Sequence, residues 1–557
     1  MANTKMDWQK NLLLAAIAAV ILMLFIRWNH FQEQLPQHQA GNTPAGSSIA
    51  AIAPDSNGDI PSAVPTASDT PQATADSSKV ELIQVKTDNL LVTINPLGGD
   101  IASVSLPRHF AKLNTPDEPF VLLDNRNNHT YVSQSGLIGT NGTDTAQGRP
   151  LFNSSSTSYE LKEGSDGLVV DLTLQQGAVN ITKRFSFKRG DYLIGVEYLI
   201  DNQAETPWSA QLYGQIKRDS QNFVKVSALE MNPYLGAAIT TSEENYKKIH
   251  FEDIAKQTFE TSRQGGWVAM VQHYFISAWI PDASSQVNYK LRKLGDQDLY
   301  LLGFTTQPVV VEPGSKGVIK ASFYAGPKDT ERLEEISPYL DLTVDYGWLW
   351  WIAKPLFAFL KFIHGFLGNW GLAIIGLTLS VKLLFFPLSA ASYRSMAKMR
   401  KLQPKLLELK ERYGEDRQKF SQEMMKLYKT EQVNPFGGCL PLLIQMPVFI
   451  ALYWVLMESV ELRHAPFFGW IEDLSRMDPY FVLPIIYGAT MWIMQKLNPQ
   501  PTDPMQARIM NMLPFVFTFM FLWFPAGLVL YWVTNNLLSI AQQYVITRQI
   551  ERADSKA

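Results

Sequence analysis

The chain has 557 residues, too many for one compact soluble domain, so we expect at least two folded units. Its formal net charge of −3 argues against a general nucleic-acid-binding protein, and its single cysteine, Cys439, excludes an intrachain disulfide. Hydrophobic residues make up 46% of the chain, but they concentrate near the N-terminus and after residue 345, so the average describes neither part.

An uninterrupted apolar run extends from Leu12 to Ile26, and two lysines precede it. Its length lies between that of a signal-peptide core and that of a full membrane span. No small-residue cleavage site follows closely, and Trp28 is of a type that is enriched at membrane interfaces. We therefore expect a cytoplasmic N-terminus at 1–10 and an uncleaved transmembrane anchor at 11–28, with a cleaved signal peptide as the alternative.

The chain between the anchor and residue 345 divides into a linker and a β-rich domain. The linker, 29–79, is rich in Pro, Ala, Ser, Thr, Gly and Asp, and it cannot bury enough apolar surface to offset its chain entropy. The domain, 80–345, has short alternating runs bounded by turn residues, such as Leu168–Leu174 and Tyr192–Tyr198. This pattern predicts antiparallel strands in a large β-sandwich, closed by a short helix near Asp329–Leu340.

Residues 346–368 are rich in tryptophan and phenylalanine, but they also carry Lys354 and Lys361 near one face of a helix. This composition predicts an amphipathic helix that lies flat at the membrane interface. The alternative is a true membrane span, against which the two lysines and Pro355 argue.

Five further apolar segments predict transmembrane helices, the second at 369–388 and the third to sixth within 433–546. The last two segments meet near Pro525, in a tight hairpin turn or in the kink of one long helix. The segments are Trp370–Phe386, Gly437–Met457, Tyr480–Met494, Ile509–Phe524 and Ala526–Ile546.

The charge of the loops predicts the orientation of these spans. Eleven basic residues lie between Phe386 and Val433, and so short and basic a loop should stay in the cytoplasm. The segment Glu458–Asp478 carries five acidic and two basic residues and should be periplasmic. With the N-terminal anchor this gives six spans, a periplasmic β-rich domain and a cytoplasmic tail at 547–557.

The basic loop, 389–432, has apolar residues at spacings of three and four along Met396–Leu409 and again after Tyr413–Asp416, which predicts a cytoplasmic helical hairpin. Its positive charge could attract anionic lipid headgroups or ribosomal RNA, although positive-inside topology alone also explains it. The candidate contact residues are Arg394, Lys398, Arg400, Lys401 and Lys405.

Several polar residues stand within the predicted spans. An uncompensated lysine at mid-membrane costs roughly 2.5–3.5 kcal/mol, yet Lys382 is near enough to the cytoplasmic end to reach the headgroups instead. Buried amides such as that of Gln445 should point away from lipid. These polar residues predict either interhelical hydrogen bonds alone or a water-accessible groove open to the cytoplasm. They are Thr378, Lys382 and Gln445, with a polar stripe on the last span formed by Tyr531, Asn535, Ser539 and Gln542.

Enzyme signatures are weak in this chain. It has no H-E-x-x-H, G-x-S-x-G or Walker motif, and the S-x-x-K match at Ser395–Lys398 lies on the charged hairpin, where it arises by chance. No cluster with metal-ligand spacing is present in the sequence. We therefore expect no catalytic residues, no metal and no cofactor. A small-solute transporter or channel is the alternative class, although the two halves show no inverted repeat.

Several motifs together resemble the YidC/Oxa/Alb insertase family in its Gram-negative form. The resemblance covers the whole chain and implies a multi-pass α-helical membrane protein with six spans, a periplasmic β-supersandwich domain and a cytoplasmic helical hairpin. The motifs are Ser395–Arg400, Leu402–Lys405, Val433–Pro435 with Gly437–Cys439, Pro441–Pro447, and Leu522–Pro525 with Gly527–Tyr531.

The resemblance also implies a function, which is to insert, fold and help assemble inner-membrane proteins, alone or with the Sec translocon. The implied partners are nascent membrane proteins, the Sec translocon, the ribosome and inner-membrane lipids. Lys382 matches a groove position that is usually Arg, and Trp532 matches one that is often Tyr. The implied groove is lined by Thr378, Lys382, Gln445, Asn535 and Ser539, and the implied hydrophobic slide for clients by Met446, Pro447, Phe521, Tyr531 and Trp532.

Overall fold

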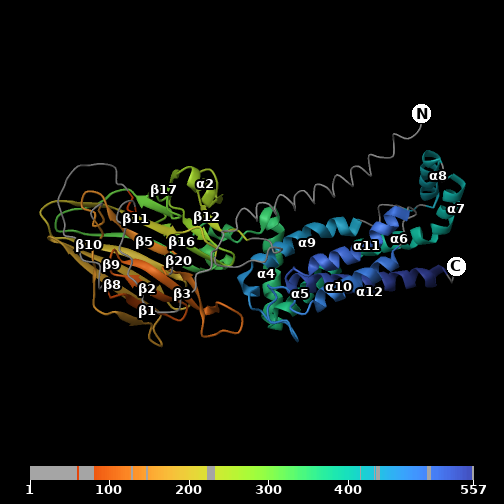
Figure 1. Ribbon diagram of the computed structural model, residues 1–557, viewed down its shortest axis with the longest axis horizontal. Helices are drawn as coiled ribbons and strands as arrows, with labels where there is room; N and C mark the ends of the chain where they lie inside the picture. The colour runs from red at the N-terminus through yellow and green to blue at the C-terminus, as the bar shows by residue number, and fades with distance from the viewer. Residues whose placement is uncertain are drawn as a thin grey trace, which may run out of the picture. The chain divides into compact units, whose positions relative to one another are not determined.

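The computed structural model describes residues 59–61, 81–126, 129–145, 148–222, 233–413, 416–431, 433, 440–498 and 504–554. The predicted anchor at 11–28 and most of the predicted linker lie outside these residues, and so does Cys439. The described elements belong to one compact unit, Ala53–Ala557, in which a β-rich part precedes a helical part along the chain (Figure 1).

Two sheets form the described β-rich part, and their strand pairs are antiparallel except for β1 with β7. In the first sheet β4 pairs with β3 and β19 pairs with β11, beside the main path. The main path runs β14 (Phe259–Gln264), β17 (Gln286–Lys293), β18 (Tyr300–Thr306), β11 (Trp208–Arg218), β5 (Tyr131–Ile138), β3 (Asp100–Phe110), β2 (Leu91–Asn95), β1 (Ile83–Lys86) and β7 (Ser158–Glu160), with β4 at Pro119–Leu123 and β19 at Val309–Val311. The second sheet runs β13 (Lys247–Ile249), β12 (Gly236–Ile239), β15 (Val268–Val271), β16 (Phe275–Pro281), β20 (Lys316–Pro327), β10 (Leu193–Asn202), β9 (Val179–Lys188), β8 (Gly167–Gln176) and β6 (Asn153–Ser154).

Side-chain alternation decides which residues of these strands enter the core. In β10, Ile194, Val196 and Tyr198 are buried while the residues between them are partly exposed, as the period of a strand requires. Each fully buried aliphatic or aromatic side chain contributes about 1.5–3 kcal/mol relative to its exposed state. Buried residues of both sheets form one cluster. The predicted strand at Leu168–Leu174 falls within β8, and the one at Tyr192–Tyr198 falls within β10 except for its first residue.

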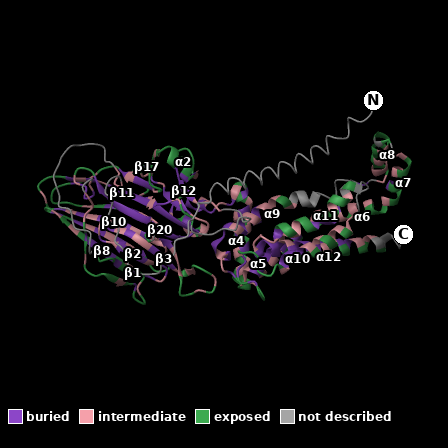
Figure 2. Ribbon diagram, viewed as in Figure 1, coloured by how far each residue is buried: buried purple, intermediate pink, exposed green. Residues whose placement is uncertain are grey.

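The helical part follows β20 and a short helix that Asp329 caps by accepting from two backbone amides. Figure 2 shows that buried residues dominate the sheets, whereas α11 and α12 carry many exposed residues. The described α-helices are α2 (Phe251–Lys256), α3 (Thr330–Ile336), α4 (Trp350–Leu367), α5 (Trp370–Leu384), α6 (Phe386–Lys401), α7 (Gln403–Tyr413), α8 (Arg417–Thr430), α9 (Leu440–Glu458), α10 (Val482–Leu497), α11 (Pro504–Phe521) and α12 (Ala526–Asp554). Short 3-10 helices lie at Leu340–Thr343, Gly347–Leu349 and Val460–Leu462.

The helix α4 packs against α5 and α9. Its two lysines, which the sequence placed near one helical face, form ion pairs with the segment that follows the sheets: Lys354 with Asp341, and Lys361 with Glu331 at 2.9 Å. The helix also exposes large aromatic residues, among them Phe362. An amphipathic helix is therefore present, and its polar face is turned towards the protein.

Two helix breaks were not predicted from the apolar pattern. The apolar segment at Trp370–Phe386 is the helix α5, but α6 starts directly after Phe385 with its axis bent by 67°. Pro387 lies in the first turn of α6, where its missing amide hydrogen costs least. The predicted single helix at Met396–Leu409 is likewise interrupted at Leu402, two residues before Pro404.

Among the described residues, no single helix combines the length and the hydropathy that a membrane span requires. The bent pair of α5 and α6 does so when its two helices are taken together. Between α11 and α12 the chain leaves the helical conformation, so these are two helices separated by residues 522–525.

Candidate functional site

A cluster of polar side chains lies between α5, α9 and α12. Lys382 on α5 is only 6% exposed, and its Nζ donates to Ser539 Oγ on α12 at 2.8 Å and to Gln445 Oε1 on α9 at 3.3 Å. Gln445 Nε2 donates in turn to Asn535 Oδ1 at 2.5 Å. Four of the five predicted groove residues are thus joined in one hydrogen-bonded network.

The regular geometry of α12 explains why this network can form. Asn535 and Ser539 are four residues apart and therefore share one helical face. Ser539 Oγ donates to the backbone oxygen of Asn535 at 2.7 Å, so its lone pairs remain to accept from Lys382. Tyr531, four residues earlier on this face, has its hydroxyl oxygen 3.4 Å from Gln445 Nε2. Three successive turns of α12 therefore each contribute one polar group to the network, at Tyr531, Asn535 and Ser539.

No carboxylate of the described residues pairs with the positive charge of Lys382. Among the residues that the structure describes, its hydrogen-bond partners are the neutral oxygens of Gln445 and Ser539. A charge that is solvated only by neutral oxygens in an apolar bundle attracts an incoming anion more strongly than a paired charge does. The cluster can therefore accept a carboxylate. Ser539 is close to Lys382, but its hydroxyl donates to the backbone oxygen of Asn535 and accepts from the ammonium group, so the two are not arranged as a nucleophile and its base.

Thr378, the fifth predicted groove residue, is placed differently. Its side chain is buried on α5, and its hydroxyl donates to the backbone oxygen of Ile374 at 2.6 Å. This bond satisfies the hydroxyl within its own helix. The Ser380 hydroxyl likewise donates to a backbone oxygen, that of Gly376, at 2.9 Å. Its proton is therefore directed to the backbone, and Ser380 forms no catalytic dyad with Lys382.

The predicted slide residues do not form one continuous exposed surface. Phe521 is buried and packs with Trp532 and Tyr487, at ring-centroid distances of 6.1 Å and 4.6 Å. Tyr531 is also buried, whereas Met446 is 38% exposed and Pro447 is partly exposed. A larger set of exposed apolar residues lies on α11, within the predicted span Ile509–Phe524, and was not part of the predicted slide. It includes Ile509, Met512, Phe515, Val516 and Phe519.

The predicted lipid or ribosome contacts lie on α6 and α7. Arg394, Lys398, Arg400, Lys401 and Lys405 are all exposed. Lys405 also pairs with Glu431 after α8 at 2.7 Å, which links the two sides of the predicted hairpin. An exposed pair of this kind contributes about 0–1 kcal/mol, so most of the charge of this surface stays available to a partner.

A second polar contact on α12 was missed. Asn536 Nδ2 donates to Thr490 Oγ1 on α10 at 3.2 Å, and Gln543 Nε2 donates to the backbone oxygen of Leu497 at 3.2 Å. Asn536 directly follows Asn535 and therefore faces a different neighbour. The spacing of seven residues between Asn536 and Gln543 was a usable signal for this second stripe.

In the described part of the chain, no three His, Cys, Asp or Glu side chains come together as a metal site would require. The polar network offers amide, hydroxyl and ammonium groups, of which the ammonium repels a cation. The residues present therefore suit an anionic ligand rather than a metal.

Comparison with known proteins identifies the family. The family described as "YidC periplasmic domain" matches residues 82–359, and "60Kd inner membrane protein" matches residues 362–553. The chain is 54% identical to the membrane protein insertase YidC of Saccharophagus degradans, over 98% of this chain and 100% of the relative. It is 51% identical to that of Ectopseudomonas mendocina, over 99% and 100%.

A solved structure titled "Active YidC insertase crystal structure with the first transmembrane domain resolved" is 19% identical, covers 83% of this chain and 93% of its own, and has a TM-score of 0.37. The two family matches together cover most of the chain, and the relatives match it over nearly their full length. The β-rich part is the periplasmic domain of these proteins, and the helical part is their inner-membrane region. The chain therefore belongs to the YidC family of bacterial membrane protein insertases.

Proposed function

We propose that this protein inserts nascent membrane proteins into the bacterial inner membrane through the polar network around Lys382. The observation that carries the proposal is the ammonium group of Lys382, buried between three apolar helices and held by Gln445 and Ser539 without a carboxylate partner among the described residues. A charge buried among membrane helices is costly, so its presence indicates a function, and here it offers a binding site to acidic residues of a client.

The proposed mechanism lowers the barrier that a client's polar tail meets in hydrocarbon. The amide and hydroxyl groups of Gln445, Asn535 and Ser539 would replace part of the water that the tail loses. Lys382 would attract acidic residues of that tail, and the membrane potential would act on them in the same direction. The apolar segment of the client would leave along exposed apolar helices such as α11, and transfer into lipid would drive that step.

The topology that this mechanism requires has six spans, with the periplasmic domain between the first and second spans and both termini in the cytoplasm. Loop charge supports it, because the basic segment at α6–α8 and the acidic segment after α9 would then lie on opposite sides. The exposed basic residues Arg394, Lys398 and Lys405 would face anionic lipid or a ribosome. We further propose that the protein works alone or with the Sec translocon.

Reconstitution in liposomes tests this function. The client is a single-span protein with an acidic translocated tail, and protease protection of the tail reports its insertion. We compare the unaltered chain with Lys382→Arg, Lys382→Ala and Lys382→Glu, after checking that all four unfold at the same temperature. Insertion should persist with Arg and fall at least about tenfold with Ala and Glu, the loss expected for about 1.4 kcal/mol or more of lost attraction.

Equal insertion by all four proteins would show that Lys382 does not act on the client. Asn536→Ala is the matched control, because it removes a polar contact of α12 that lies outside the network. A flux assay with small solutes in the same liposomes addresses the transporter alternative. Solute release without client insertion would contradict the insertase function.

A further inference from the structure

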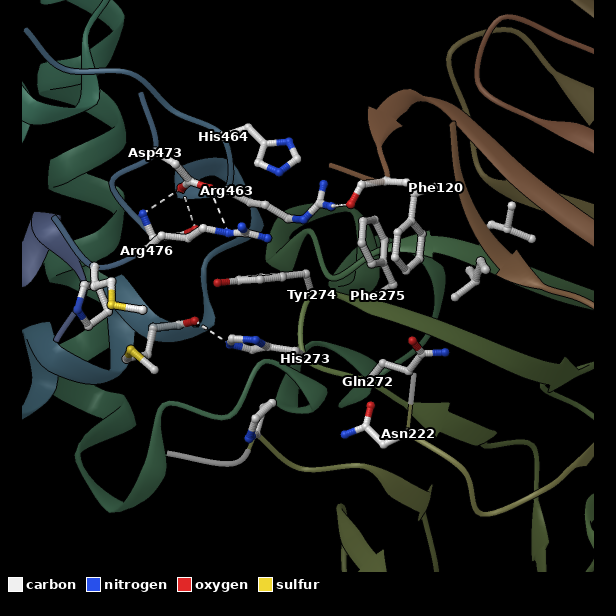
Figure 3. A pocket seen from close by; sticks show the side chains of 18 of the residues that line it. Phe120, Asn222, Gln272, His273, Tyr274, Phe275, Arg463, His464, Asp473 and Arg476 are labelled. Carbon is white, nitrogen blue, oxygen red and sulfur yellow. Dashed lines mark hydrogen bonds and ion pairs between the residues drawn. The ribbon is translucent and has the colours of Figure 1, made fainter. Parts of the chain in front are cut away.

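A pocket of about 1200 Å³ lies where the β-rich part meets the helical part, and we call it the junction pocket (Figure 3). The sheets contribute Phe120, Arg218 and the segment from Gln272 to Phe275. The helical part contributes the last turns of α9, the loop that carries Arg463 and Arg476, and the turn between α11 and α12. The volume exceeds the 300–1,000 Å³ that is usual for small-molecule sites, so the pocket has room for a larger ligand.

The charged residues that line the junction pocket are mostly positive. Arg218, Arg463 and Arg476 line it, with Asp473 as the one lining carboxylate among the described residues. Figure 3 shows Asp473 beside Arg476, and the distance from Arg476 Nε to Asp473 Oδ2 is 3.7 Å. One carboxylate cannot neutralise three guanidinium groups, so the pocket favours an anion.

Arg218 is a buried arginine with unused hydrogen-bonding capacity. It is 3% exposed and stacks over the ring of Tyr131 at 4.5 Å, and its Nη2 donates to the backbone oxygen of Gln221 at 3.2 Å. Its Nε and Nη1 are buried, and neither has a hydrogen-bond partner among the residues that the structure describes. Leaving such donors unpaired costs about 1–3 kcal/mol each, more for a charged group, which an acceptor in the pocket would recover.

Arg463 shows how an arginine is fixed at this junction. Its Nη2 donates to the backbone oxygen of Phe110 at 2.6 Å, and its guanidinium lies 5.6 Å and 5.5 Å from the rings of Phe120 and Phe275. The two rings are themselves stacked, with centroids 4.1 Å apart. These contacts hold the guanidinium where it lines the junction pocket, and Figure 3 shows Arg463 beside Phe120.

Aromatic and apolar side chains make up much of the remaining lining, together with polar ones such as Asn222, Gln272 and Ser475. Tyr453 and Met457 from α9, Phe481 before α10, and Trp523 and Phe524 between α11 and α12 line the pocket. Aromatic residues of this kind gather where a protein meets both lipid and water. A ligand that combines an anionic group with hydrocarbon would therefore match both parts of the lining.

We propose that the junction pocket binds an anionic phospholipid from the periplasmic leaflet, with its phosphate near Arg218 and Arg463 and its chains against the ends of α9 and α11. The proposal rests on the proposed topology, which places these helix ends at the periplasmic face. An acidic client segment is the competing occupant. It is disfavoured because a buried peptide backbone must satisfy a donor and an acceptor at almost every residue, whereas acyl chains need no hydrogen bonds against the aromatic side chains.

Native mass spectrometry of the full chain in detergent tests the proposal. The protein is titrated with phosphatidylglycerol, and separately with phosphatidylcholine of the same acyl chains, with sodium phosphate, and with a synthetic acidic peptide. We expect phosphatidylglycerol to be retained preferentially, because each basic residue near an anionic lipid contributes about fivefold to affinity. Equal retention of the two lipids would overturn the proposal. Binding of phosphate alone with equal strength would also overturn it, and so would displacement of the lipid by the peptide.

Variants locate the site. The double variant Arg218→Gln with Arg463→Gln should retain phosphatidylglycerol no better than phosphatidylcholine, whereas Arg218→Lys with Arg463→Lys should keep most of the preference. Arg184→Gln is the matched control, because Arg184 pairs with Asp171 on the sheet surface and does not line the pocket. A preference that survives the double Gln variant would overturn the assignment.

Two further measurements keep the test decisive. If the double Gln variant unfolds, Arg476→Gln replaces it, because Arg476 is 65% exposed and its substitution should leave the packing intact. The preference for phosphatidylglycerol over phosphatidylcholine should then fall by about fivefold. The client-insertion assay is run on the same proteins. If the arginine variants lose the lipid preference but still insert the client, the pocket binds lipid independently of the insertase function. If the Lys382 variants lose insertion, the lipid preference of the pocket should remain unchanged, so the two proposals can fail separately.

Discussion

A buried ion pair joins the two parts of the molecule, and its removal gives the sharpest stability prediction. Lys328, directly after β20, donates from Nζ to Glu458 Oε2 at the end of α9 over 2.7 Å, and to the backbone oxygen of Thr343 at 3.3 Å. The two side chains are 2% and 9% exposed. Next to this pair, His273 Nε2 lies 2.8 Å from the backbone oxygen of Met457.

The proposed change is Lys328→Met, which keeps most of the volume and removes the charge. Glu458 then remains buried as a carboxylate without its partner, which costs about 3–5 kcal/mol. The double variant Lys328→Met with Glu458→Gln leaves no charge in the site and should recover most of that loss. We therefore expect a coupling energy of at least about 2 kcal/mol between the two positions.

The assay is equilibrium unfolding of the full chain in mild detergent, followed by tryptophan fluorescence. Lys316→Met is the control, because Lys316 is 78% exposed and its pair with Asp201 at 3.4 Å contributes at most about 1 kcal/mol. A loss below about 1 kcal/mol for Lys328→Met would refute the reasoning. A double variant no more stable than the single one would refute it as well.

Three further predictions use the same unfolding assay. Burial raises the pKa of Glu461 to about 7, so between pH 4.5 and 7 the folded chain binds more protons than the unfolded chain. The free energy of unfolding therefore falls as the pH rises through that range, and Glu461→Gln should flatten this slope. Gly371→Ala would place a Cβ 2.0 Å from the ring of Phe467 and should cost about 1–3 kcal/mol of stability. Gly365→Ala is the control, because its Cβ would have no atom within 4 Å, and it should not destabilise the protein. Equal stability of the two variants would contradict the close approach at Gly371. Asn536→Ala removes one interhelical hydrogen bond and should cost only about 0.6 kcal/mol, so a loss above about 2 kcal/mol would contradict its purely structural role.

Local sequence patterns were sufficient for much of the fold. Period-two alternation located strands such as β8 and β10, because successive side chains of a strand point to opposite faces. The break at Tyr413–Asp416 likewise separates α7 from α8. The spacing of Asn535 and Ser539 placed them on one helical face, which is a property of a single helix. Each of these features depends on neighbours within a few residues.

Contacts between distant segments could not be read from such patterns. The sequence left open whether Lys382 reaches the headgroups or turns inward, and its partners Gln445 and Ser539 lie 63 and 157 residues away. From the sequence, the two lysines of α4 indicated a helix at the membrane interface. In the structure they form ion pairs with Asp341 and Glu331 of the preceding segment.

The junction pocket had no signature in the sequence at all. Its cations come from a strand end at Arg218 and from the loop that carries Arg463 and Arg476, more than 200 residues later in the chain. Composition and periodicity determine which elements form, because propensity and amphipathicity act locally. Which charges meet is decided by how those elements pack, because the energy of a charge depends on the groups that replace its water, and only the tertiary structure supplies those groups.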